Sequence, residues 1–197
     1  GMEWAVEQDV DVISMSVGGL DNVYYESMIE AVRNAEAYGT VVVAASGNGG
    51  SNKTTSPGNV YDSISVGATR PDGTIAGFSG GDKIRADAWN TPPADWPETY
   101  TVPTVLAPGV KIKSSVPGGE YNEFKGTSQA TPHVAGTVAL MRAASHEQLP
   151  PDKIESILES TAVEVDAEQT RQGSGRIDTA AAVETVAAQP NIIVNIT

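Results

Sequence analysis

Ser128 is the residue of this chain best placed to do chemistry, because it stands at the start of a predicted helix. Gly126 permits a tight or left-handed backbone just before it, and Thr127 is a good N-cap residue. Backbone N–H groups in the first turn of a helix lack intrahelical partners, and the helix dipole is positive there. This arrangement favours negative charge beside the serine, which is the charge that an attacked carbonyl group develops.

The residues after Ser128 predict a helix with an irregular first turn. Val134, Val138 and Met141 recur at i, i+4 and i+7 and so give the helix an apolar face. Pro132 lies one turn in and has no N–H to return to the Ser128 carbonyl group. For an isolated Gly-Thr-Ser, a cap on an ordinary core helix is the better interpretation. The complete run, with its proline, indicates a specialised helix start instead.

The elements that must position this serine alternate between strands and helices. Buried-strand patterns cover residues 9–16, 40–46, 64–69 and 104–107. Helical patterns cover residues 1–8, 25–39, the stretch after Ser128, the stretch after Pro150-Pro151 and the stretch capped by Asp178 or Thr179. This order predicts an α/β fold with a largely parallel sheet flanked by helices. Ligands of such sheets bind at the carboxyl ends of the strands, where Ser16, Asn48 and Pro108 fall.

Three stretches, in the same order along the chain, resemble the subtilisin-like serine proteases over about residues 2–188. They are Ser16-Val17-Gly18-Gly19, Ala45-Ser46-Gly47-Asn48, and Gly126-Thr127-Ser128 with Pro132-His133-Val134-Ala135-Gly136. The first two are weak motifs alone, since Asn48 could be a turn residue in a glycine loop. The third is specific. The resemblance implies a subtilisin-like fold and a serine-type endopeptidase that acts on polypeptides through an acyl-enzyme on Ser128.

The resemblance also assigns roles to the individual residues. Ser128 is the expected nucleophile, and the Asn48 amide and the Ser128 N–H are the expected oxyanion donors. The expected substrate cleft is lined by Ser16, Val17, Gly18, Ala45, Ser46 and Gly47. Main-chain groups at a strand end can bind any extended peptide, and pockets add selectivity. Small residues around Ser46 suggest a roomy, apolar primary pocket.

A serine hydroxyl needs a base, and the base needs an orienting acid. The family draws both from Asp and His stretches that would precede Gly1, and neither stretch is in this sequence. His133 lies about 140° around the helix from Ser128, so we expect a structural, partly buried and hydrogen-bonded histidine there. His146 is expected to be solvated. The chain is therefore predicted to be the C-terminal part of a catalytic domain that is inactive alone, with a peptide-binding pseudoprotease as the alternative.

The predicted domain spans residues 1–188, and residues 189–197 form a tail or the start of a following module, with a strand at 192–196. Residues 80–103 are expected to be a loop insertion without secondary structure, packed on itself through Trp89, Trp96 and Tyr100 rather than offered to substrate. The N-terminal strands of the parent domain are expected to be absent. Their absence would leave a sheet edge bare, and a bare edge favours self-association.

Composition and motif spacing argue against nucleic-acid binding, a membrane span and a phosphate-binding loop. The net charge of −13, with only 12 Lys and Arg, argues against nucleic acid, and no apolar run is long enough for a transmembrane helix. Lys53-Thr54 ends a glycine-rich loop, but Asn52 stands where a phosphate loop requires glycine. No cofactor or metal is expected for catalysis. The resemblance allows a structural calcium ion, and its ligands stay unassigned because the spacing of Asp62, Asp72, Asp82 and Asp87 matches no calcium motif.

We expect the parent protein to be extracellular, as the resemblance to secreted proteases implies. The acid-rich and lysine-poor composition would suit a high-salt organism, because salt screens the self-repulsion of a strongly acidic surface.

Overall fold

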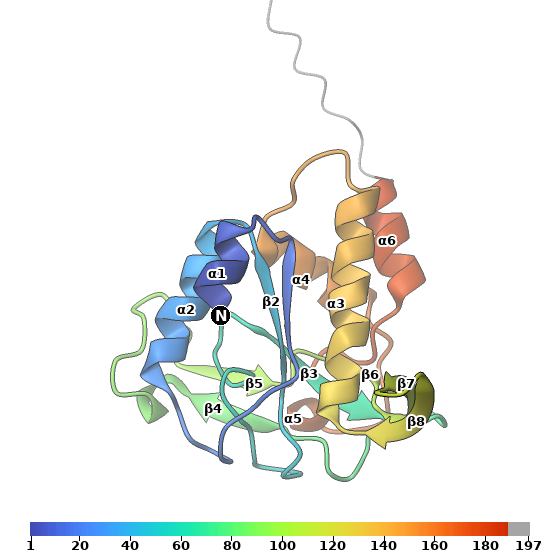
Figure 1. Ribbon diagram of the computed structural model, residues 1–197. Helices are drawn as coiled ribbons and strands as arrows, with labels where there is room; N and C mark the ends of the chain where they lie inside the picture. Colours follow the sequence, from blue (N-terminus) through green and yellow to red (C-terminus); the bar gives the residue numbers. More distant parts are fainter. Residues whose placement is uncertain (189–197) are drawn as a thin grey trace, which may run out of the picture.

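A four-stranded parallel sheet forms the centre of the computed structural model, which describes residues 1–188 (Figure 1). Its strands lie in the order β1 (Val12–Met15), β2 (Val41–Ala45), β3 (Ile64–Thr69) and β6 (Val105–Pro108). Each neighbouring pair is parallel. Strands β2 and β3 are buried along their whole length, as strands covered on both faces must be. The predicted α/β fold is therefore confirmed.

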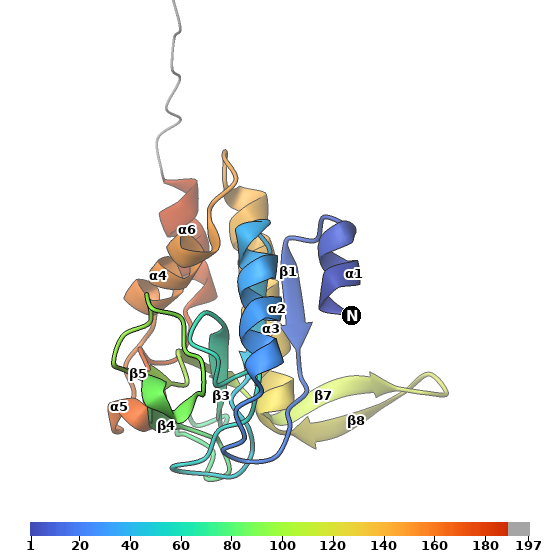
Figure 2. The same ribbon diagram turned by 90° about the vertical axis from the view of Figure 1, so that its left-hand side faces the viewer.

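Helices cover both faces of this sheet (Figures 1 and 2). The helices are α1 (Met2–Glu7), α2 (Glu26–Ala37), α3 (Thr127–Ala144), α4 (Pro151–Thr161), α5 (Gln169–Gln172) and α6 (Thr179–Ala187). The apolar side chains of α3, α4 and α6 pack on one face, while those of α2 pack on the other. Asp178 caps α6 as predicted, since its carboxylate accepts from the Ala181 N–H at 3.0 Å. No helix within residues 1–188 is long and apolar enough to cross a membrane.

Successive residues of the central strands point to opposite faces of the sheet, and one of these faces supports α3. Val41 and Val43 of β2 face α3 together with Val66 of β3, whereas Val42 faces α2. On α3, Val134, Val138 and Met141 are fully buried against this layer, along with Ala130. The helix that carries Ser128 is therefore fixed against the sheet by close packing, as its i, i+4, i+7 pattern predicts.

Residues 80–103 contain secondary structure, so the expectation of a plain loop is wrong. Strands β4 (Asp82–Arg85) and β5 (Thr99–Val102) pair antiparallel, with a short 3-10 helix, η1 (Ala86–Ala88), between them. The expectation of self-packing is confirmed. Trp89 and Trp96 are 2% and 7% exposed, and their rings meet edge to face at 5.5 Å between centroids. The aromatic side chains of the insertion therefore share one apolar cluster with Ile29 and Val32 of α2 and Val42 of β2.

A second antiparallel pair, which the sequence analysis did not identify, projects from the body of the molecule (Figure 2). Strands β7 (Val110–Val116) and β8 (Glu120–Lys125) form this hairpin, with Gly118 and Gly119 both at positive φ between them. The alternation of Val110 and Ile112 with lysines and the following Gly-Gly pair were signals that could have predicted it. The strand expected at 192–196 lies outside the described residues.

Candidate active site

Ser128 is the second residue of α3, and Gly126 rather than Thr127 is the N-cap. The predicted cap is therefore wrong by one residue. Gly126 adopts φ +153°, which L side chains rarely adopt, so glycine is the residue that permits the turn into the helix. The hydroxyl group of Thr127 does not cap because it contacts the glycine loop after β2. Its Oγ1 lies 3.2 Å from the Gly47 carbonyl oxygen, and the whole residue is 0% exposed.

The side chain of Asn48 is oriented by the same threonine. Asn48 Oδ1 accepts a hydrogen bond from the Thr127 N–H at 2.9 Å and lies 3.2 Å from Thr127 Oγ1. With its oxygen held against Thr127, the amide presents Nδ2 as its free donor end. Thr127 is the residue directly before Ser128, so the amide and the serine are tied together through one short segment of backbone.

One cavity of about 340 Å³ brings the predicted residues together. It is lined by Val17, Gly18, Gly19, Asp21, Ala45, Gly47, Asn48, Gly49, Thr55, Thr127 and Ser128. Two predicted cleft residues, Ser16 and Ser46, are not among these. The Ser46 side chain is fully buried behind the wall, where its hydroxyl donates to the Gly80 carbonyl at 3.1 Å. Ser16 instead contacts Ser128 directly.

Thr55 lines the same cavity and was missed by the sequence analysis. A Cβ atom on Gly18 would lie 2.4 Å from Thr55 Oγ1, and one on Gly47 would lie 3.0 Å from Thr55 Cγ2. The two glycines therefore allow Thr55 to fill the space between the segments that follow β1 and β2. No signal within the polar loop marked this threonine. With Thr55 and the carboxylate of Asp21 on its wall, the cavity is more polar than the expected roomy apolar pocket.

The hydroxyl group of Ser128 donates to the Ser16 carbonyl oxygen at 3.1 Å. Within residues 1–188, neither histidine forms a hydrogen bond with it. His133 Nδ1 lies 2.8 Å from the Gln129 carbonyl oxygen of its own helix. His133 is hydrogen-bonded as expected but exposed rather than partly buried, because no described element covers that side of α3. His146 is exposed, as predicted.

Lys53, the lysine at the end of the glycine-rich loop, pairs with a carboxylate. Its Nζ lies 3.3 Å from Asp21 Oδ2 at the rim of the cavity. Within the described residues, no group of three or more His, Asp or Glu side chains is arranged to hold a metal ion. The structural calcium ion therefore remains an expectation from the resemblance, without assigned ligands.

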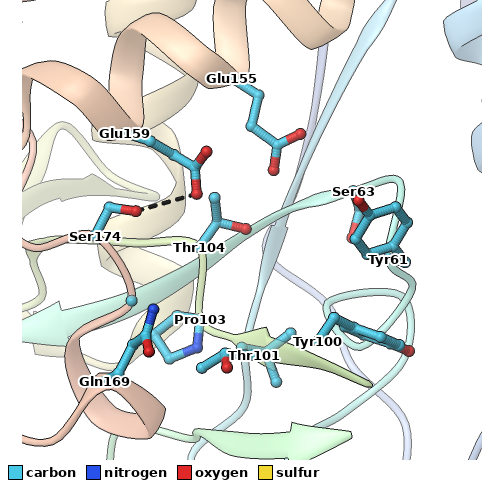
Figure 3. Close-up of a pocket in the computed structure, with 12 residues that line it drawn as sticks. Tyr61, Ser63, Tyr100, Thr101, Pro103, Thr104, Glu155, Glu159, Gln169 and Ser174 are labelled. Carbon is cyan, nitrogen blue, oxygen red and sulfur yellow. Dashed lines mark hydrogen bonds between the residues drawn. The ribbon is translucent and has the colours of Figure 1, made fainter. Parts of the chain in front are cut away.

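A second cavity, of about 270 Å³, is lined by two carboxylates, Glu155 and Glu159 (Figure 3). Burial, followed by the charge of Glu159, raises the pKa of Glu155 to about 8. Both serines that line this cavity are occupied. Ser174 donates to Glu159 at 3.0 Å, and Ser63 donates to the backbone of its own turn. Neither serine that lines this cavity has a free hydroxyl group, so the cavity offers no second serine nucleophile.

Known proteins resemble this chain in sequence. A model of the Subtilase family matches residues 1–175. Subtilisin E from Bacillus subtilis is 37% identical over 167 residues, which cover 82% of this chain and 38% of that protein. Subtilisin DY from Bacillus licheniformis is 35% identical, covering 93% of this chain and 61% of that protein. The chain thus spans less than two thirds of the length of these relatives.

Solved structures show the same fold. The patellamide maturation protease PatA superposes with a TM-score of 0.76 at 25% identity, covering 96% of this chain and 67% of that one. The prenylagaramide maturation protease PagA gives a TM-score of 0.75 at 25% identity, and the match covers 94% of this chain and 65% of that one.

Proposed function

Because this chain belongs to the subtilase family, we propose that it is the nucleophile-bearing part of a serine endopeptidase domain. The observation that carries the proposal is the shared cavity of Ser128 and Asn48 at the start of α3. The helix start supplies unpaired N–H groups beside the serine, and Thr127 holds the Asn48 amide by its oxygen so that its nitrogen is free. A carbonyl group bound in this cavity would meet a nucleophile and two donors.

The proposed reaction proceeds through an acyl-enzyme. Ser128 Oγ attacks the carbonyl carbon of the peptide bond, its proton passes to a base, and the carbonyl oxygen becomes an oxyanion held by Asn48 Nδ2 and the Ser128 N–H. The C–N bond then breaks as the base returns the proton to the leaving amine. Water hydrolyses the resulting ester by the same steps and restores the Ser128 hydroxyl group. The base, oriented by an acid, comes from chain outside these 197 residues, so this chain alone is inactive.

A polypeptide substrate would lie along the segment that follows β1. Val17 and Gly18 line the cavity from this side, and Ala45 and Gly47 line it from the end of β2. An extended peptide can hydrogen-bond to such main-chain groups whatever its side chains are. Selectivity then rests on the space left by Thr55, which stands between the two segments.

A fluorophosphonate probe tests the proposal, because it labels only an activated serine. We expect labelling of Ser128 in the full-length parent protein and none in residues 1–197 alone. Asn48→Ala should slow labelling by about 10²- to 10³-fold, the usual effect of removing one oxyanion donor. Asn34→Ala, at an exposed position on α2, is the matched control and should label at the wild-type rate. Rapid labelling of the isolated chain would show that the base lies within it.

A peptide-binding pseudoprotease is the second candidate. One observation favours it, namely that the Ser128 hydroxyl donates to a backbone carbonyl group rather than to a base within the described residues. A full-length protein that binds peptides but is not labelled, and does not cleave them, would establish this alternative.

Self-association through the sheet edge is a further part of the proposal. Within the described residues, β1 pairs only with β2, so its other edge has no strand partner. Light scattering of residues 1–197 at rising concentration should report a mass above that of the monomer, and a constant monomeric mass would refute this part.

We also propose an extracellular location for the parent protein, which fractionation of the source cells would test.

A further inference from the structure

Pro132 leaves the carbonyl group of Ser128 without its usual helical partner. In an α-helix the N–H of each residue bonds to the carbonyl group four positions earlier, and the residue four positions after Ser128 is Pro132. Proline has no N–H to give. The carbonyl oxygen of the proposed nucleophile therefore needs a donor from elsewhere, or it stays solvated.

Ser16 supplies that donor. Its Oγ donates to the Ser128 carbonyl oxygen at 2.7 Å, across 112 positions of sequence. The contact is reciprocal, because Ser128 Oγ donates to the Ser16 carbonyl oxygen at 3.1 Å. Ser16 directly follows β1, whose position is fixed by its pairing with β2. Two hydrogen bonds thus join the end of a core strand to the first turn of α3, at the residue that carries the nucleophile.

We propose that Ser16 is a positioning residue whose hydroxyl group replaces the N–H that Pro132 lacks. By holding the Ser128 carbonyl group, it fixes the first turn of α3, so that the Ser128 hydroxyl and N–H face the cavity shared with Asn48. Ser16 is not a catalytic residue, because its hydroxyl touches neither substrate nor the reacting atoms. The inference rests on the proposed function and adds a residue role to that site. The ordinary alternative is an exposed serine whose hydroxyl group contributes nothing.

The test is a double-mutant cycle in the full-length protein, with kcat and KM for a peptide substrate as the readout. Ser16→Ala should lower kcat by about tenfold, which is the upper range for one neutral hydrogen bond. KM should stay unchanged, because alanine keeps the main-chain groups of the segment along which the peptide is proposed to bind. In the Pro132→Ala background the residue at this position has an N–H for the Ser128 carbonyl. There, Ser16→Ala should change kcat by less than about twofold. Ser16→Thr, which retains the hydroxyl group, should restore most of the activity.

Ser14→Ala is the matched control, since Ser14 is an exposed serine of β1, two residues before Ser16. It should leave kcat and KM at their wild-type values. An effect of Ser16→Ala that is equally large with Pro132 present and in the Pro132→Ala background would overturn the inference. So would an effect on KM alone, or a Ser14→Ala variant as impaired as Ser16→Ala.

A second readout does not require activity. The ¹³C resonance of the Ser128 carbonyl carbon reports the hydrogen bond to its oxygen. It should shift on Ser16→Ala when Pro132 is present and remain nearly constant in the Pro132→Ala background. If the wild-type protein cleaves no peptide, the proposed function fails, and this resonance still decides whether Ser16 replaces the missing N–H. An unchanged resonance on Ser16→Ala with Pro132 present would refute the inference by itself.

Discussion

The hydroxyl group of Tyr100 should contribute a large share of the stability of the inserted segment. It accepts a hydrogen bond from Trp89 Nε1 at 2.8 Å and donates to the Asn59 carbonyl oxygen at 2.8 Å. Asn59 is 0% exposed and Trp89 is 2% exposed, so water cannot replace the hydroxyl group for either partner. Burial raises the pKa of Tyr100, which keeps the hydroxyl group neutral and able to donate. Tyr100→Phe therefore leaves one buried donor and one buried acceptor unsatisfied.

The cost follows from that count. Each buried polar group left without a partner costs about 1–3 kcal/mol, so the two groups left by Tyr100→Phe should lower the free energy of unfolding by about 2–6 kcal/mol. The phenyl ring remains and keeps its edge-to-face contact with Trp96, at 5.7 Å between centroids. The loss would therefore arise from the hydrogen bonds rather than from a cavity.

Urea unfolding followed by tryptophan fluorescence measures this loss. With a denaturant slope of about 2 kcal/mol per M, the midpoint should fall by roughly 1–3 M. Tyr38→Phe is the control, because Tyr38 is 75% exposed and its midpoint should not move. A Tyr100→Phe midpoint within error of the wild type would refute the reasoning, since it would mean that both buried groups find other partners.

Two further predictions concern pH and specificity. Burial, and then the charge of Asp62, raises the pKa of Glu36 to about 8, so the folded state retains a proton that the unfolded state releases near pH 4.5. Stability should therefore fall as the pH rises from about 4.5 to 8, and Glu36→Gln should be more stable than wild type by about 2 kcal/mol at pH 9 in urea unfolding, with no difference at pH 4. Thr55→Gly should enlarge the cavity, and the ratio of kcat/KM for peptides with phenylalanine rather than alanine before the cleaved bond should rise by about tenfold or more. An unchanged ratio would show that Thr55 does not limit the pocket.

The parallel core could be predicted from the sequence because its signals are local. Residues 40–46 are an unbroken apolar and β-branched run, and the structure buries β2 on both faces within that range. The apolar face of α3 follows from spacing alone. The observed strands and helices of this core differ from the predicted ones only at their end residues, where sequence patterns are least informative.

The insertion at 80–103 could not be predicted in the same way, because the residues of its two strands carry no local pattern that indicates their pairing. Strand β4 contains one buried residue, Ile84, between charged neighbours, so it shows no clear alternation of apolar and polar residues. Its partner β5 lies beyond a stretch of tryptophans and prolines that suggests a loop. The pair is held by the aromatic cluster beneath it, which is a tertiary contact that overrides local preference.

At the site, the sequence predicted which residue types would meet but not all of their contacts. Ser128 and Asn48 line one cavity, as the resemblance implied. Thr127 was predicted to cap α3 because threonine is common at that position, yet its hydroxyl group is directed to the Gly47 carbonyl. Thr55 carried no signal, since its part in the cavity depends on Gly18 and Gly47, glycines of two other segments that the fold brings to it.

The start of α3 departs from the rules for a stable helix in several ways at once. Its N-cap side chain makes no capping bond, its first residue is a buried threonine, and a proline interrupts its bonding one turn in. Two backbone groups of this turn bond outside the helix: the Thr127 N–H donates to Asn48, and the Ser128 carbonyl group, which the proline leaves without its helical donor, accepts from Ser16. With an N–H at position 132, the helix would satisfy the Ser128 carbonyl group by itself, whereas the Thr127 N–H, like every N–H of a first turn, would still need a partner outside the helix. Departures of this kind are expected where function rather than stability selects the residue, and here they accompany contacts that join three separate segments at Thr127 and Ser128.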